Sequence, residues 1–426
     1  MGKEEGIYKA VSVSKDLNLM AADFPEKEFE IYRLLRDYLP VSSNSRVGSG
    51  ILDDGSGTGW FFAREEDVAY VFRHPEIFSS DMGFGWIPQA VDPPEHTEYR
   101  KILNPLFSQE AMNPLESRIQ EFANDLIDKI LQKDEFEYMD DFAEPFPTII
   151  FCELMGFPLE DYPKFMHWKD VFIHGMTAGK AEKIIGKHIL DDQGRIQPDK
   201  VREAQVAAGQ ELYAYFNSLI EERRRDPKDD LTTALVQAKY AGERLLTDEE
   251  LLKTLHLLML GGLDTVTSTL GLSMVYFTQH PEKRKEFIEL MDDPDRVYPA
   301  VEELVRYTAI VSPARKVSQE CTYRGLQLHP GDTVMISTPS ANRDERVFPN
   351  PDEVIYDRHP NPHAGFALGI HRCLGMHLAR RELKIGLQEF HRRIPNYSLQ
   401  SGKEAIVYGG GVKGVTSLPL VIGKGS

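Results

Sequence analysis

Cysteine is scarce in this chain of 426 residues, which has only Cys152, Cys321 and Cys373, with no two of them in a CxxC pair. A small, odd and widely spaced set argues against a disulfide framework and against a structural zinc site. Positive charge is also in deficit: 49 Lys and Arg residues face 67 Asp and Glu residues, and the formal net charge is −18. Because phosphate binding needs a basic surface, this deficit argues against nucleic acid as the main partner.

Long apolar runs are missing as well. No run approaches the ~18 apolar residues that a membrane span needs, and the N-terminus lacks the apolar segment of a secretory signal. We therefore expect a cytoplasmic protein with no membrane span. With 41% apolar and 27% charged residues, the composition is that of an ordinary globular protein, and the chain length favours an enzyme.

The pattern along the chain predicts a mainly α protein (α+β) with a minor β region. No repeat or Gly/Ser linker divides the sequence, so residues 1–426 are predicted to form a single domain, with a loosely patterned segment over residues 1–50. Helical periodicity is found at 67–73, 115–132, 142–155, 160–175 and 201–225, and short β-prone runs lie at 58–62 and within 317–356. The polar stretch 178–198 is predicted to be a long loop. Asp92 is predicted to cap a further helix, with Glu95 completing a capping box.

One predicted helix is unusual in its length and in its polar residues. Thr247 to Glu250 forms a capping box, and the apolar pattern continues to Gln279, which predicts a helix over 248–279 of roughly 48 Å. The segment around Leu255 to Leu263 is apolar nearly all round, as in a buried helix. Yet Gly261 and Gly262 each cost about 1 kcal/mol relative to Ala, and Asp264 and Thr265 place polar groups where core is expected.

Two interpretations of this helix remain open at this point. In one, Asp264 forms a buried Asp–Lys or Asp–Arg pair that only packs helices together. In the other, the glycines let a flat ligand approach the backbone, and Thr265 donates to the Gly261 carbonyl four residues earlier. Glycines and polar residues that interrupt a buried helix in this way often mark functional sites.

The segment from Phe366 to Gly375 surrounds the third cysteine. A lone Cys is usually a small buried hydrophobe. Cys373, however, follows His371 and Arg372 and precedes a helical run from Met376, and both a helix N-terminus and adjacent cations are predicted to lower the pKa of a thiol. The thiolate is the metal-binding form. Glycines in this loop would let backbone approach a flat ligand closely.

The pattern Phe366-x-x-Gly369-x-His371-Arg372-Cys373-x-Gly375 resembles the haem-binding loop of the cytochrome P450 family. The pair Glu303 and Arg306, with Arg358 further on, resembles the family's structural charge triad, and Gly261-Gly-Leu-Asp-Thr265 resembles the oxygen-binding groove of its central helix. The likeness extends from about Thr58 to Leu420. The form GGLDTV, together with Ile87-Pro88 before Asp92, is similar to camphor-hydroxylating bacterial members. The resemblance implies the cytochrome P450 fold, with haem between the long central helix and the helix after the Cys loop.

The resemblance also implies roles for individual residues. Cys373 would be the thiolate ligand of the iron of haem b, and Asp264 and Thr265 would deliver protons to the bound oxygen. The cofactor-binding set would comprise His96, Arg100, Gly261, Arg315, Phe366, Gly369, His371, Cys373 and Gly375, with His96, Arg100, Arg315 and His371 on the haem propionates. Glu303, Arg306 and Arg358 would be structural.

The substrate pocket implied by the same likeness is apolar. Its walls would be Phe84, Trp86, Met259, Leu260, Val311 and Val412, which predicts a hydrophobic small molecule of the terpenoid, steroid or aromatic class. Phe84 stands where camphor-hydroxylating members have a hydrogen-bonding Tyr, which argues against a bond to a ketone at that position. We hypothesise that residues 178–198 cover the substrate entrance.

The chain has no flavin or iron–sulfur module, so electrons from NAD(P)H would arrive through an iron–sulfur ferredoxin and its reductase. Residues 371–393 contain six Lys and Arg residues but only Glu382 and Glu389 as acids, and this local charge of +4 predicts a docking face. The function predicted is a haem-thiolate monooxygenase that uses O2. A peroxide-driven peroxygenase and a non-catalytic haem-thiolate sensor remain the alternatives, and the Asp264–Thr265 pair argues against the peroxygenase.

Overall fold

The computed structural model describes residues 2–19, 21, 23–43, 58–176 and 180–423. The helices are α1 (Lys3–Asp16), α2 (Phe24–Tyr38), α3 (Glu65–Arg73), α4 (Glu95–Leu106), α5 (Gln109–Met112), α6 (Glu116–Ile130), α7 (Pro145–Met155), α8 (Tyr162–His174), α9 (Ala181–Ile185), α10 (Pro198–Arg225), α11 (Leu231–Gln237), α12 (Asp248–Gln279), α13 (Pro281–Leu290), α14 (Pro294–Thr308), α15 (Thr338–Ala341) and α16 (Met376–Arg393). The strands are β1 (Val41–Ser43), β2 (Gly59–Phe62), β3 (Phe78–Ser79), β4 (Glu135–Glu137), β5 (Lys239–Tyr240), β6 (Arg244–Leu245), β7 (Ala314–Val317), β8 (Cys321–Tyr323), β9 (Leu326–Leu328), β10 (Thr333–Ile336), β11 (Tyr397–Leu399), β12 (Ile406–Tyr408), β13 (Gly414–Ser417) and β14 (Pro419–Ile422). The chain is therefore helix-rich with a minor β region, as the sequence pattern predicts.

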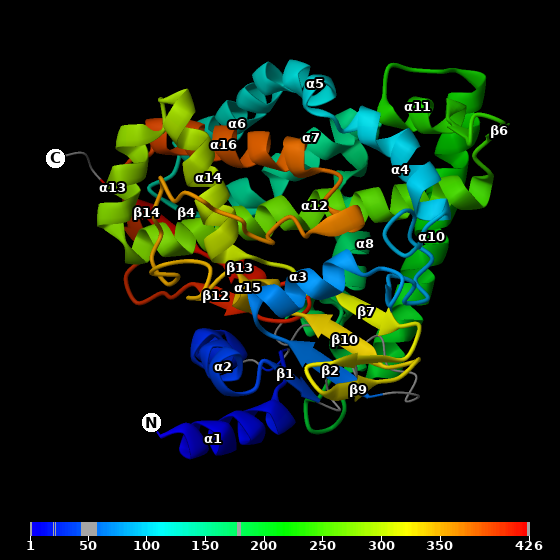
Figure 1. Cartoon of the computed structure of the whole chain (residues 1–426). Helices are drawn as coiled ribbons and strands as arrows, with labels where there is room; N and C mark the ends of the chain where they lie inside the picture. The colour runs from blue at the N-terminus through cyan, green and yellow to red at the C-terminus, as the bar shows by residue number, and fades with distance from the viewer. Residues whose placement is uncertain (1, 20, 22, 44–57, 177–179, 424–426) are drawn as a thin grey trace.

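Helix α12 is a central helix of 32 residues that runs across the molecule (Figure 1). Its bounds agree with the predicted helix over 248–279, and both bonds of its capping box are present: Thr247 N donates to Glu250 at 2.7 Å, and Glu250 N donates to Thr247 Oγ1 at 3.2 Å. By length and composition α12 could cross a membrane, but 78% of its apolar window is buried inside the protein. It is therefore the core helix of the fold.

Two apolar clusters flank α12. One joins α12 to α6, α14 and α16, and the other joins it to α7, α8 and α10. In Figure 1, α6, α7 and α16 lie above α12, and the main sheet lies below it. That sheet has the order β1-β2-β10-β7-β3, in which β10 runs parallel to β2 and antiparallel to β7. A smaller sheet, β11-β14-β4, joins the C-terminal part of the chain to the strand after α6.

Three local expectations are wrong. Residues 1–50 are more regular than expected, because α1, α2 and β1 lie within them; residues 44–50 are outside the described part. Asp92 does not cap α4, which begins at Glu95 behind Pro94; its carboxylate instead accepts from Ser80 N at 2.9 Å and from the Ser79 hydroxyl.

The third expectation concerns the predicted loop over 178–198. Its first two residues, 178 and 179, are outside the described part, but the rest folds into α9, a 3-10 turn at Lys187–Ile189 and a bridge between Leu190 and Ile196. Ala181 and Ile189 are buried there against Val201 of α10. The apolar residues spaced through this polar stretch supply a small core of their own.

Candidate active site

The middle of α12 opens on one side. Leu257, Gly261 and Thr265 are spaced four residues apart, so they share one face of the helix, and none of the three is buried although most of their neighbours are. A Cβ atom added to Gly261 would meet nothing within 4 Å, whereas one added to Gly262 would lie 2.3 Å from the Phe151 ring. The Thr265 hydroxyl donates to the Gly261 carbonyl at 2.9 Å, as expected. This face of α12 therefore has open space beside it at Gly261.

Cys373 lies in the loop that leads into α16, which packs against α12 (Figure 1). Its backbone N–H donates to the Phe366 carbonyl at 2.9 Å, and the Phe366 ring is covered by the Arg380 guanidinium at 4.8 Å. Burial raises the pKa of the Cys373 thiol, and this outweighs the Gly375 N–H and the nearby arginines, which lower it. The prediction of a lowered thiol pKa is thus wrong for the protein alone, because the sequence does not reveal how the chain packs around the half-buried Cys373.

The two glycines of this loop do different things. Gly375 has open space where its side chain would be, as expected for a surface that a flat ligand approaches. Gly369 adopts a φ of +68°, and a Cβ atom there would lie 2.3 Å from the Phe72 carbonyl oxygen of α3. Gly369 therefore serves a tight turn against α3 and does not leave room for a ligand.

Four basic side chains from three parts of the chain gather near this loop, and none of them is in a salt bridge among the described residues. They are His96 and Arg100 of α4, Arg315 of β7, and His371. The imidazole rings of His96 and His371 are 4.2 Å apart, and in both the buried Nε2 has no hydrogen-bond partner among the described residues. Burial lowers the pKa of His96 to about 4, that of His371 to about 2 and that of Arg315 to about 10.

Among the described residues, none of these four groups is in a salt bridge. Arg315 is buried, and a buried guanidinium is costly unless an anion accompanies it. The buried Nε2 atoms of His96 and His371 likewise lack a hydrogen-bond partner. The donor set therefore fits a flat ligand that carries carboxylates, with a thiolate ligand for its metal. Haem is such a ligand: Cys373 would hold its iron, the four basic groups would hold its propionates, and the open space at Gly261 and Gly375 would leave room for its ring.

Asp264 is buried beside three cationic or titratable side chains that sequence analysis did not single out. His174 Nε2 donates to its carboxylate at 2.9 Å, and Lys169 Nζ lies 3.5 Å from the same oxygen. Burial alone would raise the pKa of Asp264, but His174, Lys169 and Lys180 hold it well below its usual value. The buried Asp–Lys pair of the packing interpretation is therefore present, and it keeps the carboxylate ionised one residue from Thr265.

The expected charge triad is assembled around Glu303 of α14. Arg306 donates to the fully buried Glu303 at 2.7 and 2.9 Å, and Arg358 donates to the same carboxylate at 3.0 and 3.1 Å. Arg306 also donates to three backbone carbonyls in the 342–353 segment. This network fixes the irregular chain that precedes the Cys373 loop.

Comparison with known proteins now decides the family. The Cytochrome P450 family profile matches residues 69–293 and 297–401 of the chain. The chain belongs to the cytochrome P450 family. A probable cytochrome P450 127A1 of Sinorhizobium fredii is 34% identical over 377 residues, which cover 86% of this chain and 84% of the relative.

A relative named vitamin D(3) 25-hydroxylase, of Pseudonocardia autotrophica, is 30% identical over 387 residues, covering 87% of this chain and 89% of its own. The crystal structure of CYP109E1 from Bacillus megaterium in complex with testosterone superposes with a TM-score of 0.79 at 26% identity and covers all of both chains. This P450 is therefore an oxidoreductase of the monooxygenase type, in a family that binds haem iron and uses redox partners and hydrophobic substrates.

The residues expected to line the substrate pocket of this P450 fall into three groups. Phe84 and Trp86 stack with ring centroids 4.5 Å apart, and Val311 and Val412 are joined by an isolated β-bridge. Met259 and Leu260 of α12 are both buried in the apolar cluster with α7 and α8. Leu257, which sequence reasoning did not single out, shares the partly exposed face of α12 with Gly261 and Thr265, and only its spacing from them could have indicated this.

The basic segment 371–393 is less positive in the folded P450 than in the sequence. Arg380 pairs with Glu302 at 2.6 Å, Arg392 with Asp292 at 2.5 Å, and Arg393 with Asp128 at 2.6 Å. Arg381 and Lys384 share Glu116 at 3.3 and 3.5 Å. The counted charge of +4 is therefore compensated by acids from other elements, with Arg372 left exposed on the loop itself.

Proposed function

We propose that this P450 is a ferredoxin-dependent haem-thiolate monooxygenase that hydroxylates a hydrophobic small molecule. One observation carries the proposal: four basic side chains without a salt bridge among the described residues, two of them with an unpartnered buried Nε2, occur in a protein whose central helix is open at Gly261 and Thr265. In the net reaction, a C–H bond of the substrate and one O2 consume two electrons and two protons and give an alcohol and water.

Bound haem supplies the site that activates O2. Cys373 would ligate its iron from the side of α16, and His96, Arg100, Arg315 and His371 would hold its propionates. The Thr265 hydroxyl, which donates to the Gly261 carbonyl, would accept a hydrogen bond on the substrate side. Asp264 would pass protons toward Thr265, as a general acid–base group.

Asp264 needs a path to solvent, since it is only 2% exposed. Lys169 supports such a path, because its Nζ lies 3.5 Å from Asp264 and 2.7 Å from Asp170, whose side chain is 26% exposed. His174, whose Nε2 lies 2.9 Å from the Asp264 carboxylate, gives Asp264 a second polar neighbour. The relay we propose therefore runs from Asp170 through Lys169 to Asp264.

The substrate class is supported by the apolar walls and by the relatives. Phe84, Trp86 and Val311 offer no charge to a ligand, so shape would orient the substrate. One relative is named for vitamin D(3), and one structural neighbour was solved with testosterone. We infer a substrate of the terpenoid, steroid or aromatic class, which the 178–198 segment would cover at its entrance.

The electron donor we propose is an iron–sulfur ferredoxin with an NAD(P)H-dependent reductase, in the cytoplasm. The exposed loop residues Ile370 and Arg372 lie next to the thiol and give such a donor an approach to the haem. Since most basic residues of α16 are paired, we expect modest electrostatic steering.

The test is product formation from testosterone by the purified, haem-loaded protein with ferredoxin, reductase and NADPH under isotopically labelled O2. One labelled oxygen atom in the product is the expected result. Turnover with hydrogen peroxide alone at an equal rate would favour the peroxygenase. NADPH consumption that no hydrophobic compound of a steroid and terpenoid panel stimulates would favour the sensor.

A further inference from the structure

Glu28 of α2 and Lys413 form a buried ion pair that the proposed function does not use. Lys413 Nζ lies 3.1 Å from both carboxylate oxygens of Glu28, and the two side chains are 9% and 7% exposed for Lys413 and Glu28. The residues are 385 positions apart, so the pair ties the N-terminal helix α2 to the C-terminal part of the chain. Burying two charges is costly, and an apolar pair often holds the same elements equally well. The stability of the fold alone therefore does not explain a charged pair here.

Lys413 ends the tip of the hairpin that β12 and β13 form. This hairpin tip comprises residues 409–413, and within it Val412 forms the isolated β-bridge with Val311. Successive side chains of strand-like chain point to opposite sides. Since Lys413 points toward Glu28, Val412 points away from α2.

The two bridged valines are more accessible than the residues beside them. Val311 and Val412 are both half-buried, whereas Ile310, Ser312 and Lys413 are buried. The side of the bridge that faces away from α2 is therefore accessible to a ligand, as expected for the wall of an apolar pocket.

The hairpin contacts α12 close to Thr265. The Tyr408 hydroxyl is 3.4 Å from Ser268 Oγ, and a Cβ atom added to Gly414 would lie 2.5 Å from the same oxygen. Tyr408 and Gly414 flank the hairpin tip on its two sides. Ser268 follows Thr265 by three residues, which is a rise of roughly 4.5 Å and about 60° around the helix. The hairpin tip therefore begins and ends next to the partly exposed face of α12 that carries Gly261 and Thr265.

The other side of the hairpin tip rests on the N-terminal segment. A Cβ atom added to Gly409 would lie 2.5 Å from the Leu19 carbonyl oxygen and 3.0 Å from the Phe24 ring, so the N-terminal chain touches the start of the tip. At the end of the tip, Glu28 holds Lys413 through both carboxylate oxygens. Packing and an ion pair thus fix the two ends, and the pair supplies the directional contact.

We propose that Glu28 is a positioning residue for the substrate pocket: by holding Lys413, it fixes the hairpin tip so that Val412 and its partner Val311 form an apolar wall beside Thr265. The inference rests on the proposed function for the place of the reaction. It concerns binding, which is measured without electrons or O2. A ligand with a large apolar group should sense the position of this wall, whereas a ligand that reaches only the iron should not.

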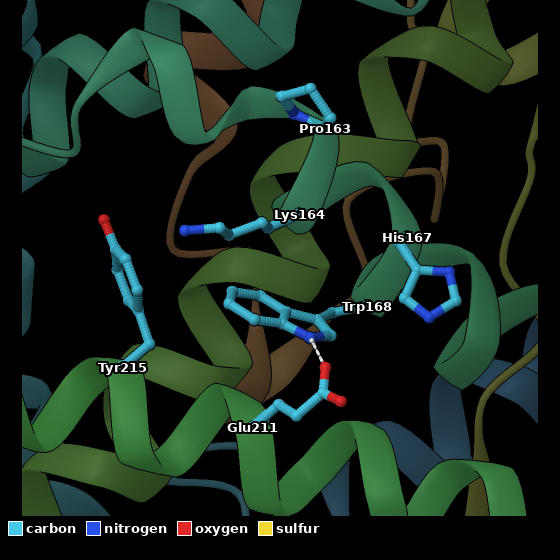
Figure 2. A pocket seen from close by; sticks show the side chains of 6 residues that line it. All are labelled: Pro163, Lys164, His167, Trp168, Glu211 and Tyr215. Atoms are coloured by element: carbon cyan, nitrogen blue, oxygen red, sulfur yellow. Dashed lines mark hydrogen bonds between the residues drawn. The ribbon is translucent and has the colours of Figure 1, made fainter.

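Binding must be read at the haem, because the surface also offers an aromatic pocket between α8 and α10 (Figure 2). That pocket has a volume of about 460 Å³ and is lined by Pro163, Lys164, His167, Trp168, Glu211 and Tyr215. Three of these residues, Pro163, Lys164 and His167, are exposed. None of the six belongs to the predicted substrate pocket, so an apolar ligand bound there would leave the haem spectrum unchanged. Calorimetry alone would count binding at both places.

The experiment measures dissociation constants for imidazole and 4-phenylimidazole from the spectral change of the full-length, haem-loaded protein. Both ligands place a nitrogen on the iron, and they differ by one phenyl ring that needs apolar contacts in the pocket. Wild type is compared with E28Q, V412A and the double variant E28Q/V412A. E28M/K413M replaces the ion pair by apolar side chains, a change that is often neutral or stabilising, and it decides the question if E28Q does not fold.

D230N is the matched control for the loss of a buried charge. Asp230 pairs with Arg223 at 2.6 Å, and their side chains are 4% and 2% exposed, between α10 and α11. The pair resembles Glu28–Lys413 in burial but does not touch the hairpin. Urea unfolding and the spectrum of the resting haem establish that each variant is folded.

Wild type and D230N should bind 4-phenylimidazole more tightly than imidazole. In E28Q, and equally in E28M/K413M, the dissociation constant for 4-phenylimidazole should rise about tenfold, as for the lost contact of one apolar side chain, while that for imidazole stays within twofold. V412A should show a similar loss. Adding E28Q to V412A should cause no further loss, because Glu28 acts through Val412.

The proposal is overturned if E28Q, or E28M/K413M where E28Q does not fold, keeps the wild-type ratio of the two constants or weakens both ligands equally. It is also overturned if the losses in E28Q and V412A add in the double variant, or if wild type does not prefer 4-phenylimidazole. The proposed function fails separately: the predicted change in ratio without any oxygenated product would leave this inference standing. Product formation with an unchanged ratio would do the reverse.

Discussion

His174 Nε2 lies 2.9 Å from the carboxylate of Asp264, and this contact joins α8 to the middle of α12. Asp264 Oδ2 and His174 Nδ1 are both buried and lack partners among the described residues. The pair is therefore incompletely satisfied on both sides, which is unusual for a purely structural contact and is expected of groups that exchange a proton.

The first prediction concerns Asp264. D264N removes the ionisable carboxylate but preserves the shape of the side chain, so we expect kcat for product formation to fall at least about 100-fold. The dissociation constant for substrate should stay within twofold. S273A, which deletes a hydroxyl that donates to Thr269 on the same helix, is the control. A D264N enzyme with wild-type kcat would exclude Asp264 from the relay.

Acid should destabilise the protein through His391. The ring is 1% exposed, and burial lowers its pKa to about 4 from the usual 6.5. Between pH 6.5 and 4 the unfolded chain takes up a proton that the folded protein does not, so the free energy of unfolding decreases as the pH falls. At pH 4, we expect wild type to have lost about 3 kcal/mol relative to H391Q, compared with pH 7.

Urea unfolding of wild type and H391Q across this range measures the difference directly. Other histidines are common to both proteins, so their contributions cancel. A difference in unfolding free energy that does not change with pH would show that His391 titrates alike in the folded and unfolded states.

The charge triad should be essential for stability. E303A leaves the fully buried Arg306 without its carboxylate, and removing one partner of a buried pair costs about 3–5 kcal/mol. Urea unfolding checks this, and K285A, at the exposed pair with Glu289, should leave the midpoint unchanged. Wild-type stability of E303A would show that backbone carbonyls alone can hold Arg306.

The cluster of basic groups should govern how long haem is retained. R315A removes a charged donor expected on a propionate, so haem release to an excess of a haem-accepting protein should become about 10- to 100-fold faster. R324A removes an arginine that pairs with Asp67, outside the cluster, and should release haem at the wild-type rate. Equal release rates for all three proteins would remove Arg315 from the site.

Sequence reasoning succeeded where the determinants are local. The capping box at Thr247 and the proline after His280 bracket α12, and the agreement with the observed helix follows from contacts within a few residues. The Glu303–Arg306 pair is likewise local, being three residues apart on α14.

It failed where a partner comes from a distant part of the chain. His174 is 90 residues from Asp264, and the acids that neutralise Arg380 and Arg393 come from α14 and α6. The packing around the half-buried Cys373, which sets the direction of its pKa shift, also involves distant parts of the chain. Family likeness supplied the proposed ligand residues, but only the fold revealed the ion pairs around Asp264.

The most direct test of the central claim is the absorption spectrum of the reduced, carbon monoxide-treated protein. Wild type, C152A and C321A should show the long-wavelength Soret band of a thiolate-ligated haem, because those two cysteines lie elsewhere. C373H should still load haem but lack that band, since the imidazole replaces the thiolate. Retention of the band in C373H, or its absence from wild type, would contradict the assignment of Cys373 as the iron ligand.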